Sequence, residues 1–189
     1  NANFVFINVD TRNVGLDNMA RVGPVSEIYD LASPASVDYV CQRPIETATA
    51  NSIGLYNLLE LALVNQARLL FASSSESYGN PLQHPQKESY WGNVNPVGVR
   101  SGYDEGKRFG EALCMAYQRE KDLDVKIIRI FNTYGPRSSV NDSRVIPSFV
   151  TKALQNKPLS VHGQGEQTRS FCYVSDMVEG IIKMMESKE

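Results

Sequence analysis

The sequence predicts an α/β fold built around a parallel β-sheet. Short apolar segments alternate with helical patterns of roughly 15 to 20 residues, the arrangement that produces strand–helix–strand units. One segment, residues 125–131, is almost continuously apolar, as expected for a strand covered on both faces. The chain has 189 residues, of which 42% are hydrophobic and 21% charged, and this is enough for one globular domain with a sizeable core.

The first half of the chain alternates strands with one long helix. Apolar residues recur at helical spacing before Asn65, whereas the shorter apolar runs end in turn-forming residues. The region between Asp10 and Glu27 is polar with scattered Gly and Pro, so irregular structure with a short helix is expected there. The predicted elements are strands at residues 4–9, 27–32 and 69–72, with a helix over residues 44–65 before the last strand.

The second half begins with a long Gly- and Pro-rich loop and then a helix with a clear apolar face. Asn132 and the residues after it are expected to leave the following strand in a loop. Ser175 is in position to cap the final helix. The predicted elements are helices at residues 103–121, 146–155 and 177–186, and strands at residues 125–131, 159–161 and 169–173.

Composition excludes several classes of function. A net charge of −2 gives no electrostatic basis for binding nucleic acid or an anionic membrane, and no apolar run approaches the ~20 residues of a membrane-spanning helix. Cys41, Cys114 and Cys172 are odd in number and widely spaced, so they are interpreted as small core residues in a reducing compartment. The first residues do not resemble a signal peptide, and we expect a cytoplasmic protein.

The candidate chemistry lies between residues 69 and 108. Tyr103 and Lys107 are four residues apart at the start of a predicted helix, so their side chains point to the same side. Three serines, residues 73–75, end the predicted strand before that helix. The 32–36 turn and the Asn132 loop also follow strands, and the carboxyl ends of parallel strands share one crevice. Hydroxyls facing a Tyr–Lys pair predict a dehydrogenase that oxidises a sugar.

A series of longer motifs is more specific than the Tyr–Lys spacing alone. In order, the chain contains LASPAS (31–36), SSESYG (74–79), HPQ (84–86), YWGNVNP (90–96), YDEGKR (103–108), RIFNTYGPR (129–137) and QTRSFCYVSD (167–176). Over about residues 28 to 182 this series resembles the UDP-glucuronate decarboxylases (UDP-xylose synthases). These belong to the NAD-dependent epimerase/dehydratase family of extended short-chain dehydrogenases.

The resemblance implies a Rossmann-like parallel sheet from which two parts of the family pattern are missing. The sequence has no N-terminal Gly-rich turn of the kind that places the NAD pyrophosphate on a helix N-terminus, and it stops before the later part of the sugar-binding lobe. Residues 1–140 are expected to form a partial NAD-binding domain, and residues 141–189 a partial nucleotide-sugar-binding lobe interleaved with it. Ser74, Ser77 and Gly102 replace the threonine, valine and cysteine that are usual in the family, and Ser77 has no interpretation from sequence.

The implied activity is NAD-dependent decarboxylation of UDP-glucuronate to UDP-xylose through a C4-keto intermediate. Tyr103 is expected to act as the base, with Lys107 favouring its phenolate and hydrogen-bonding the nicotinamide ribose. Ser74 or Ser75 is expected to hydrogen-bond the C4 oxygen. Glu76 resembles the glutamate near the substrate carboxylate, although a loop carboxylate that caps backbone amides is the alternative interpretation.

Further binding residues are implied by the same resemblance. Asp10, Leu31, Ala32 and Ser33, together with Tyr103 and Lys107, are expected to contact NAD. Asn51 resembles an active-site asparagine, with a buried and internally satisfied amide as the alternative. Expected contacts to the nucleotide sugar come from Asn51, Asn132, Tyr134, Arg144 and Arg169, and an arginine suits a diphosphate.

Three further interpretations stay open at this stage. A 4,6-dehydratase or 4-epimerase shares the Tyr–Lys pair, but a dehydratase is expected to carry Asp-Glu where this chain has Ser75-Glu76. A non-catalytic nucleotide-sugar-binding homologue is favoured by the missing Gly-rich turn. Leucines at residues 55, 59 and 63, or Phe109 with Leu113, form either a homodimer interface or ordinary core. His84 and His162 are interpreted as loop residues, and no metal site is visible.

Overall fold

A three-stranded parallel sheet organises the protein. The computed structural model describes residues 4–15, 24–161 and 163–188. Strand β2 (Arg68–Ser74) lies in the middle, between β1 (Glu27–Asp30) and β3 (Val125–Ile130). In register, Ile28 is opposite Leu69, and Leu69 is opposite Val125. The predicted α/β fold with a parallel sheet is therefore confirmed.

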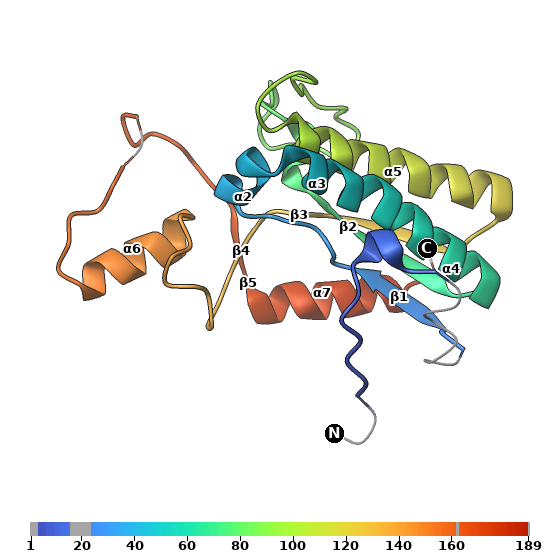
Figure 1. Cartoon of the computed structure of the whole chain (residues 1–189). Helices are drawn as coiled ribbons and strands as arrows, with labels where there is room; N and C mark the ends of the chain where they lie inside the picture. Colours follow the sequence, from blue (N-terminus) through green and yellow to red (C-terminus); the bar gives the residue numbers. More distant parts are fainter. Residues whose placement is uncertain (1–3, 16–23, 162, 189) are drawn as a thin grey trace.

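Helices cover both faces of this sheet (Figure 1). On one face lie α3 (Pro44–Thr49), α4 (Leu55–Asn65) and α5 (Ser101–Lys121), and on the other lies α7 (Val174–Glu186). Short 3₁₀ turns are η1 (Thr11–Asn13), which packs against α4, and η3 (Ser75–Tyr78), which directly follows β2. Two-sided cover is what the near-continuous apolar sequence of β3 predicted.

The core forms where β2 passes beneath α4 and α5. Leu69, Leu70 and Phe71 of β2 are completely buried or nearly so. Leu69 and Phe71 belong to the cluster shared with α4 and α5, whereas Leu70 points to the opposite face, because side chains alternate along a strand. A Cβ at Gly110 of α5 would lie 2.4 Å from the Phe71 ring. Glycine at this position is what lets α5 approach the strand that carries the serines.

The remaining elements extend beyond the main sheet. Strands β4 (Asn132–Tyr134) and β5 (Phe171–Tyr173) pair in parallel as a separate two-stranded sheet. Helix α6 (Val145–Leu154) lies away from the three-stranded sheet, between these two strands along the chain (Figure 1). The short helix α2 (Val37–Gln42), which the sequence did not predict, precedes α3. Ile45, Leu154 and Val161 are among the exposed apolar side chains of the structure.

Two predicted strands are wrong. The run at residues 4–9 forms no strand, and Phe4, Val5 and Phe6 are more than two-thirds exposed. A strand requires a neighbour to pair with its backbone, and among the described residues β1 pairs only with β2. Residues 159–161 are likewise irregular and exposed, because no described strand lies alongside them.

Three boundaries also differ from prediction. Asn132 begins β4 instead of a loop, because β5, far along the chain, supplies its partner. Ser175 does not cap α7: the helix starts at Val174 after Tyr173, and the Ser175 hydroxyl bonds the Asp176 carboxylate. The helix predicted over residues 44–65 is divided by a π-helical turn, η2 (Ala50–Gly54).

Candidate active site

The predicted Tyr–Lys pair is buried at the junction of α5 and β2. Tyr103 is 8% exposed and Lys107 is 4% exposed, so the pair does not belong to a solvated helix surface. The Lys107 ammonium donates a hydrogen bond to the Ala72 carbonyl at 2.7 Å, and its nitrogen lies 5.8 Å from the centre of the Tyr103 ring. The first turn of α5 is thereby fixed against the carboxyl end of the central strand.

The turn after β2 brings the predicted hydroxyls and carboxylate to the same place. Ser74 ends the strand, and its side-chain oxygen accepts a hydrogen bond from the Glu76 backbone amide at 3.3 Å, which starts the 3₁₀ turn η3. Burial raises the pKa of Tyr103, and a hydrogen bond with the Ser74 side chain opposes this rise, so the Ser74 hydroxyl faces the phenol. Ser75 and Glu76 then line an open cleft.

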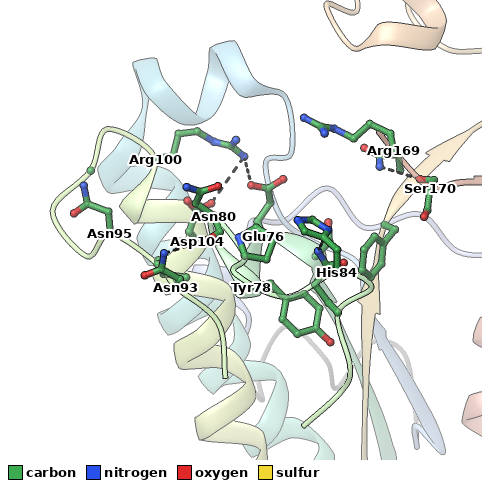
Figure 2. Close-up of a pocket in the computed structure, with 18 of the residues that line it drawn as sticks. Glu76, Tyr78, Asn80, His84, Asn93, Asn95, Arg100, Asp104, Arg169 and Ser170 are labelled. Carbon is green, nitrogen blue, oxygen red and sulfur yellow. Dashed lines mark hydrogen bonds and ion pairs between the residues drawn. The ribbon is translucent and has the colours of Figure 1, made fainter. Parts of the chain in front are cut away.

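This cleft has a volume of about 1010 Å³ and is bounded by segments from three parts of the chain. Its walls come from η3 and the following loop, from the first turn of α5, and from residues near β4 and β5. Figure 2 shows Glu76, Asp104 and Arg100 on one side and Arg169 with Ser170 on the other. Tyr103 and Lys107 do not line the cleft. Both are buried, whereas Asp104 of the same helix lines the cleft.

Three charged side chains converge beside Tyr103. Arg100 Nη2 lies 3.0 Å from Glu76 Oε2 and 3.9 Å from Asp104 Oδ1. Burial raises the pKa of Asp104 to about 6, an effect opposed by the positive charge of Arg100. Neither Arg100 nor Asp104 was singled out from sequence, although their separation of four residues, with Tyr103 between them, was a usable signal.

Burial also shifts the pKa values of the Tyr103–Lys107 pair. It raises the pKa of Tyr103, opposed first by the Ser74 hydroxyl and, among the charged groups, by Arg100. It lowers the pKa of Lys107 to about 8, opposed by the carboxylate of Asp30 at the end of β1. Burial therefore raises the pKa of Tyr103 where the sequence analysis expected Lys107 to lower it.

Asn51 occupies the π-helical turn and packs against α5 at Gly106, between Tyr103 and Lys107 along the chain. A Cβ at Gly106 would lie 3.1 Å from the Cβ of Asn51. The Asn51 amide nitrogen donates to the Thr47 carbonyl at 2.9 Å, but its buried oxygen has no hydrogen-bond partner among the described residues. Within the described part of the chain, the Asn51 amide is therefore satisfied at its nitrogen but not at its oxygen, so the alternative of an internally satisfied amide holds only in part.

A second polar network, which the sequence did not reveal, lies beneath η3. Arg129 of β3 donates through Nε and Nη2 to the two Glu111 carboxylate oxygens, at 2.8 and 2.7 Å. The Ser73 hydroxyl donates to Glu111 Oε1 at 2.5 Å and lies 3.0 Å from the Ser77 hydroxyl. Ser77, the residue without a sequence interpretation, is buried and completes this network.

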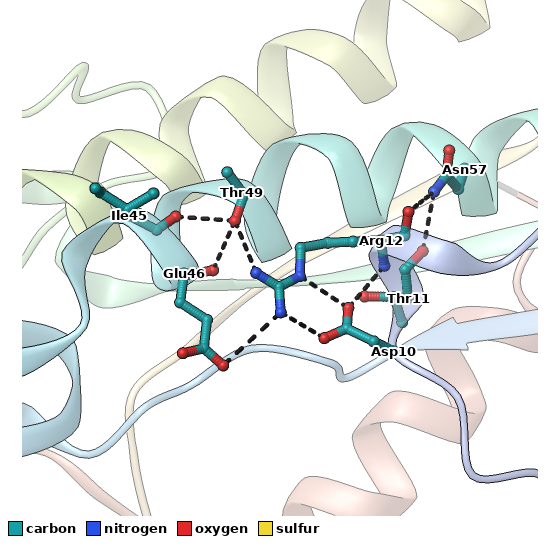
Figure 3. Close-up of polar contacts among 7 residues, drawn as sticks. All are labelled: Asp10, Thr11, Arg12, Ile45, Glu46, Thr49 and Asn57. Carbon is teal, nitrogen blue, oxygen red and sulfur yellow. Dashed lines mark hydrogen bonds and ion pairs between the residues drawn. The ribbon is translucent and has the colours of Figure 1, made fainter.

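The residues predicted to bind NAD lie in two separate places. Leu31, Ala32 and Ser33 follow β1 directly, and Leu31 and Ala32 are exposed at its carboxyl end. Asp10 lies at the start of η1, where both of its oxygens are held by Arg12, at 2.9 Å from Nε and 2.6 Å from Nη2 (Figure 3). This pairing lowers the pKa of Asp10 to about 2.

The η1 turn is fixed to the helical layer by several further contacts (Figure 3). Arg12 Nη1 donates to the Thr49 hydroxyl at 3.1 Å, and the Asn57 amide donates to the backbone oxygens of Thr11 and Arg12. Gly54 is required here, because a Cβ would lie 2.5 Å from the Thr11 hydroxyl oxygen. The N-terminal segment thus docks on α4 instead of extending the sheet.

Apart from the buried Asn51, the predicted sugar-nucleotide residues are exposed and only partly gathered. Asn132 and Arg169 line the cleft, and the Asn132 amide donates to the Ser170 carbonyl at 2.9 Å. Tyr134 packs edge-on against Tyr173 within the two-stranded sheet and does not line the cleft. Arg144 is also outside the cleft lining, and its guanidinium forms an ion pair with Asp142 that raises the pKa of Arg144.

The remaining titratable side chains do not form a second candidate site among the described residues. The described residues contain no cluster of His, Cys, Asp and Glu that is able to hold a metal ion. All three cysteines are free, and only Cys114 is buried, so the interpretation of Cys41 and Cys172 as core residues is wrong. His84 lies in the loop beside the cleft, as predicted, whereas His162 lies outside the described residues. Among the described residues, no helix is long and apolar enough to cross a membrane.

The fold and the buried Tyr–Lys pair together define a Rossmann-like protein of the short-chain dehydrogenase type. The family model described as "NAD dependent epimerase/dehydratase family" matches residues 1–189, and the chain belongs to this family.

Curated relatives carry the names of decarboxylases. The chain is 53% identical over 165 residues to UDP-glucuronic acid decarboxylase 6 of Arabidopsis thaliana, a match that covers 87% of this chain and 48% of that protein. It is 53% identical over 163 residues to UDP-glucuronic acid decarboxylase 1 of Xenopus tropicalis, covering 86% of this chain and 39% of the relative. The chain thus spans half or less of the length of these two relatives.

A solved structure has the same arrangement. The UDP-glucuronic acid 4-epimerase of Bacillus cereus, in complex with UDP-glucuronic acid and NAD, superposes with a TM-score of 0.82 at 27% identity. The superposition covers 100% of this chain and 58% of that chain. Family membership thus rests on sequence and on structure independently.

Proposed function

We propose that this chain carries the catalytic core of an NAD-dependent UDP-glucuronate decarboxylase, which forms UDP-xylose through a C4-keto intermediate. The observation that carries the proposal is the Ser74–Ser75–Glu76 turn, held beside the buried Tyr103–Lys107 pair at the wall of a cleft. The names of the relatives that are 53% identical support the same reaction. Because the chain spans only part of those relatives, the activity is proposed for the protein to which this core belongs.

In the proposed reaction the C4 hydroxyl of the sugar is oxidised first. Tyr103 accepts the hydroxyl proton, and Ser74 hydrogen-bonds the C4 oxygen as it becomes a carbonyl. A carboxylate β to that ketone then loses CO2, because the electron pair left behind is delocalised onto the carbonyl oxygen as an enolate. Glu76, at the cleft wall, is positioned to assist loss of CO2 or return of a proton.

NAD, when bound, supplies the acceptor and later the donor of the hydride. The residues that would hold its nicotinamide ribose are Tyr103 and Lys107, with Leu31, Ala32 and Ser33 nearby along the sheet edge and Asp10 for the adenine. Lys107 fits this role, because an ammonium has three N–H donors and the described residues take one of them, at the Ala72 carbonyl. The positive charge of an oxidised nicotinamide near Tyr103 would also favour the phenolate, and so would oppose the burial that raises the pKa of Tyr103.

A 4-epimerase or 4,6-dehydratase is the alternative within the same family. Both share the Tyr–Lys pair, and one solved structure with a similar fold is a UDP-glucuronic acid 4-epimerase. Ser75, where a dehydratase is expected to carry aspartate, favours decarboxylation. The product of the reaction separates these enzymes directly.

The organisation of the protein is part of the proposal. We infer that residues 1–140 act as the cofactor-binding part and residues 141–189 as a partial nucleotide-sugar lobe. Homodimerisation would use the outer surface of η2, α4 and α5, where Ile53, Tyr56 and Phe109 respectively are each about half exposed. Leu55 and Leu59, predicted as possible interface residues, are instead fully buried core. Three free cysteines support a reducing, cytoplasmic location.

Titration calorimetry with NAD and with UDP-glucuronate tests whether the 189-residue chain works alone. We expect both ligands to bind, with UDP-glucuronate binding more tightly when NAD is present. Binding of UDP-glucuronate without NAD would leave a nucleotide-sugar-binding remnant and contradict a free-standing enzyme. Failure of both would remove the activity from this chain and assign it to a larger protein.

A further inference from the structure

Arg100 uses its guanidinium differently from three other arginines of the structure that pair with carboxylates. Arg12, Arg129 and Arg144 each donate through both Nε and Nη2 to a carboxylate, in the two-point geometry for which a guanidinium is shaped. Arg100 instead meets Glu76 at a single point, Nη2 to Oε2 at 3.0 Å. Among the described residues, no carboxylate therefore matches the two-point donor edge of Arg100.

The buried atoms around Arg100 are correspondingly unsatisfied. Its Nε is buried and has no hydrogen-bond partner among the described residues, and the same holds for Oδ1 of Asp104. Leaving a buried N–H of a charged group unpaired is unfavourable, and such groups mark places where an unseen partner binds. Because the Arg100 side chain lines the cleft and is about one-third exposed, a small movement of that side chain would present Nε to a ligand there.

The position of Arg100 selects which part of a ligand it meets. It immediately precedes the first turn of α5, and its charge partly opposes the rise that burial causes in the pKa of Tyr103, so it lies near the proposed base. Figure 2 shows Arg169 extending toward Glu76 and Arg100 from the other side of the cleft. The two arginines thus face the cleft from opposite sides, and of the two only Arg100 acts on Tyr103.

A sugar with a carboxylate needs such a cation on the Arg100 side of the cleft. Glu76 and Asp104 both line the cleft, and a third carboxylate placed beside them would be repelled. A guanidinium that pairs with the incoming carboxylate removes this repulsion and fixes the plane of the carboxylate. The C5–C6 bond that breaks must lie out of the plane of the C4 carbonyl, and anchoring the carboxylate at C6 holds that bond in one direction.

We propose that Arg100 binds the C6 carboxylate of the UDP-sugar through Nε and Nη2, exchanging its single-point contact with Glu76 for a two-point pair with the substrate. This inference rests on the proposed function and deepens it, because it makes Arg100 the residue that distinguishes a uronic acid from a neutral sugar. It also accounts for the single-point contact between Arg100 and Glu76, where a two-point pair would be possible. Loss of CO2 removes the anion that Arg100 holds, so the product is bound without this contact.

The test compares two ligands that differ by the carboxylate. Dissociation constants for UDP-glucuronate and UDP-xylose are measured by calorimetry with NAD present, in a Tyr103→Phe background so that no turnover occurs. Arg100→Ala and Arg100→Lys are each compared with Arg119→Ala, a change at an exposed arginine of the same helix. Thermal unfolding of each variant checks that the fold is retained.

We expect Arg100→Ala to weaken UDP-glucuronate binding by roughly 10- to 100-fold while UDP-xylose binding changes less than about two-fold. Arg100→Lys should fall between, because a lysine keeps the charge but loses the two-point geometry. An equal loss for both sugars would mean that Arg100 merely shapes the cleft, and no loss for either would mean that it does not meet the carboxylate. Either result overturns the inference while the proposed function stands. Absence of UDP-glucuronate binding before Arg100 is changed would instead defeat the proposed function, and this inference with it.

Discussion

The two halves of the candidate site are built in opposite ways. The half on β2 and α5, with Tyr103 and Lys107, is buried in the core and fixed by hydrogen bonds to neighbouring strands. The half on the β4–β5 region, with Asn132 and Arg169, is exposed and held mostly by its own backbone. The first half is enclosed by the core, whereas the side chains of the second half bond to nearby backbone oxygens and remain open to solvent.

This contrast separates chemistry from recognition. Burial fixes the geometry of the reacting groups at the cost of shifting their pKa values in the unhelpful direction, up for Tyr103 and down for Lys107. An exposed arginine keeps its charge in water, and a diphosphate is able to bring it into place. Substitutions in the buried β2–α5 half should therefore change turnover and stability. Substitutions in the exposed β4–β5 half should change the affinity for the ligand.

The largest expected effect is the loss of the Tyr103 hydroxyl. Tyr103→Phe keeps the buried ring and removes the proton acceptor, so the turnover rate of UDP-glucuronate should fall by roughly 10²- to 10⁴-fold. The free energy of unfolding should change by less than about 1 kcal/mol. Steady-state assays and thermal unfolding of the same preparation measure both quantities. Turnover within a few-fold of the unmodified chain would remove Tyr103 from the chemistry.

The network beneath η3 should matter chiefly for stability. Glu111→Ala leaves Arg129 half-buried without its two-point partner and Ser73 without its acceptor, so the free energy of unfolding should fall by about 2–3 kcal/mol. Urea unfolding measures this change. Glu105→Ala is the matched control on α5, because Glu105 pairs with Arg108 in solvent, and it should cost less than about 1 kcal/mol. Equal losses for the two variants would show that the network contributes nothing special.

The exposed half should respond in affinity alone. Arg169→Ala removes a guanidinium that hydrogen-bonds only its neighbour's backbone among the described residues, so stability should stay within about 0.5 kcal/mol. The dissociation constants of UDP-glucuronate and UDP-xylose should both rise about ten-fold, because both carry the diphosphate. Calorimetry distinguishes this pattern from that of Arg100. A loss confined to UDP-glucuronate would reverse the roles assigned to the two arginines.

The smallest expected effect is a shift in pH dependence. Because the pKa of Lys107 is about 8, its ammonium is lost as pH rises through that value, and turnover should decline there. Asp30→Asn removes the carboxylate that opposes the lowered pKa, so the decline should move to lower pH. The other groups facing this pair, Tyr103 and Cys114, have raised pKa values and titrate at higher pH. An unchanged profile in Asp30→Asn would mean that Lys107 does not set this limb.

Stability should move in the opposite direction over the same range. The pKa of Lys107 lies below its ordinary value of 10.5, so between pH 8 and 10.5 the unfolded chain binds the proton that the folded protein has released. The contribution of Lys107 to the free energy of unfolding therefore rises with pH across this window. Comparing the chain with Lys107→Met by urea unfolding at several pH values isolates this contribution. A contribution that falls across the window would place the pKa of Lys107 above 10.5.

The buried half was largely predictable from sequence because its signals are local. A short apolar run ending in serines, followed by a helix with Tyr103 and Lys107 one turn apart, contains the strand, the helix and the pair within forty residues. The same locality failed for residues 4–9, whose apolar character is that of a strand but which find no described partner. Strand formation depends on a neighbour that a local pattern does not reveal.

The polar contacts that complete the site were not predictable for the same reason. Glu111 and Arg129 are 18 residues apart, and Ser73 is 38 residues from Glu111, so only the packing of α5 on β2 and β3 brings them together. Ser77, which had no interpretation from sequence, is a buried member of this network through its contact with the Ser73 hydroxyl. Gly102, interpreted only as non-catalytic, proved to be a contact point, since a Cβ there would lie 2.8 Å from the Pro44 carbonyl oxygen.

The measurement that tests the proposed function most directly follows the C6 carbon of UDP-glucuronate. The chain is incubated with NAD and UDP-glucuronate labelled with ¹³C at C6, and carbon NMR records where the label goes. We predict that the label leaves as CO2 and bicarbonate while UDP-xylose accumulates, and that Tyr103→Phe stops both changes. Label that stays in the sugar, as an epimerised uronic acid or as unchanged substrate with both ligands bound, would contradict the assignment of this core to a decarboxylase.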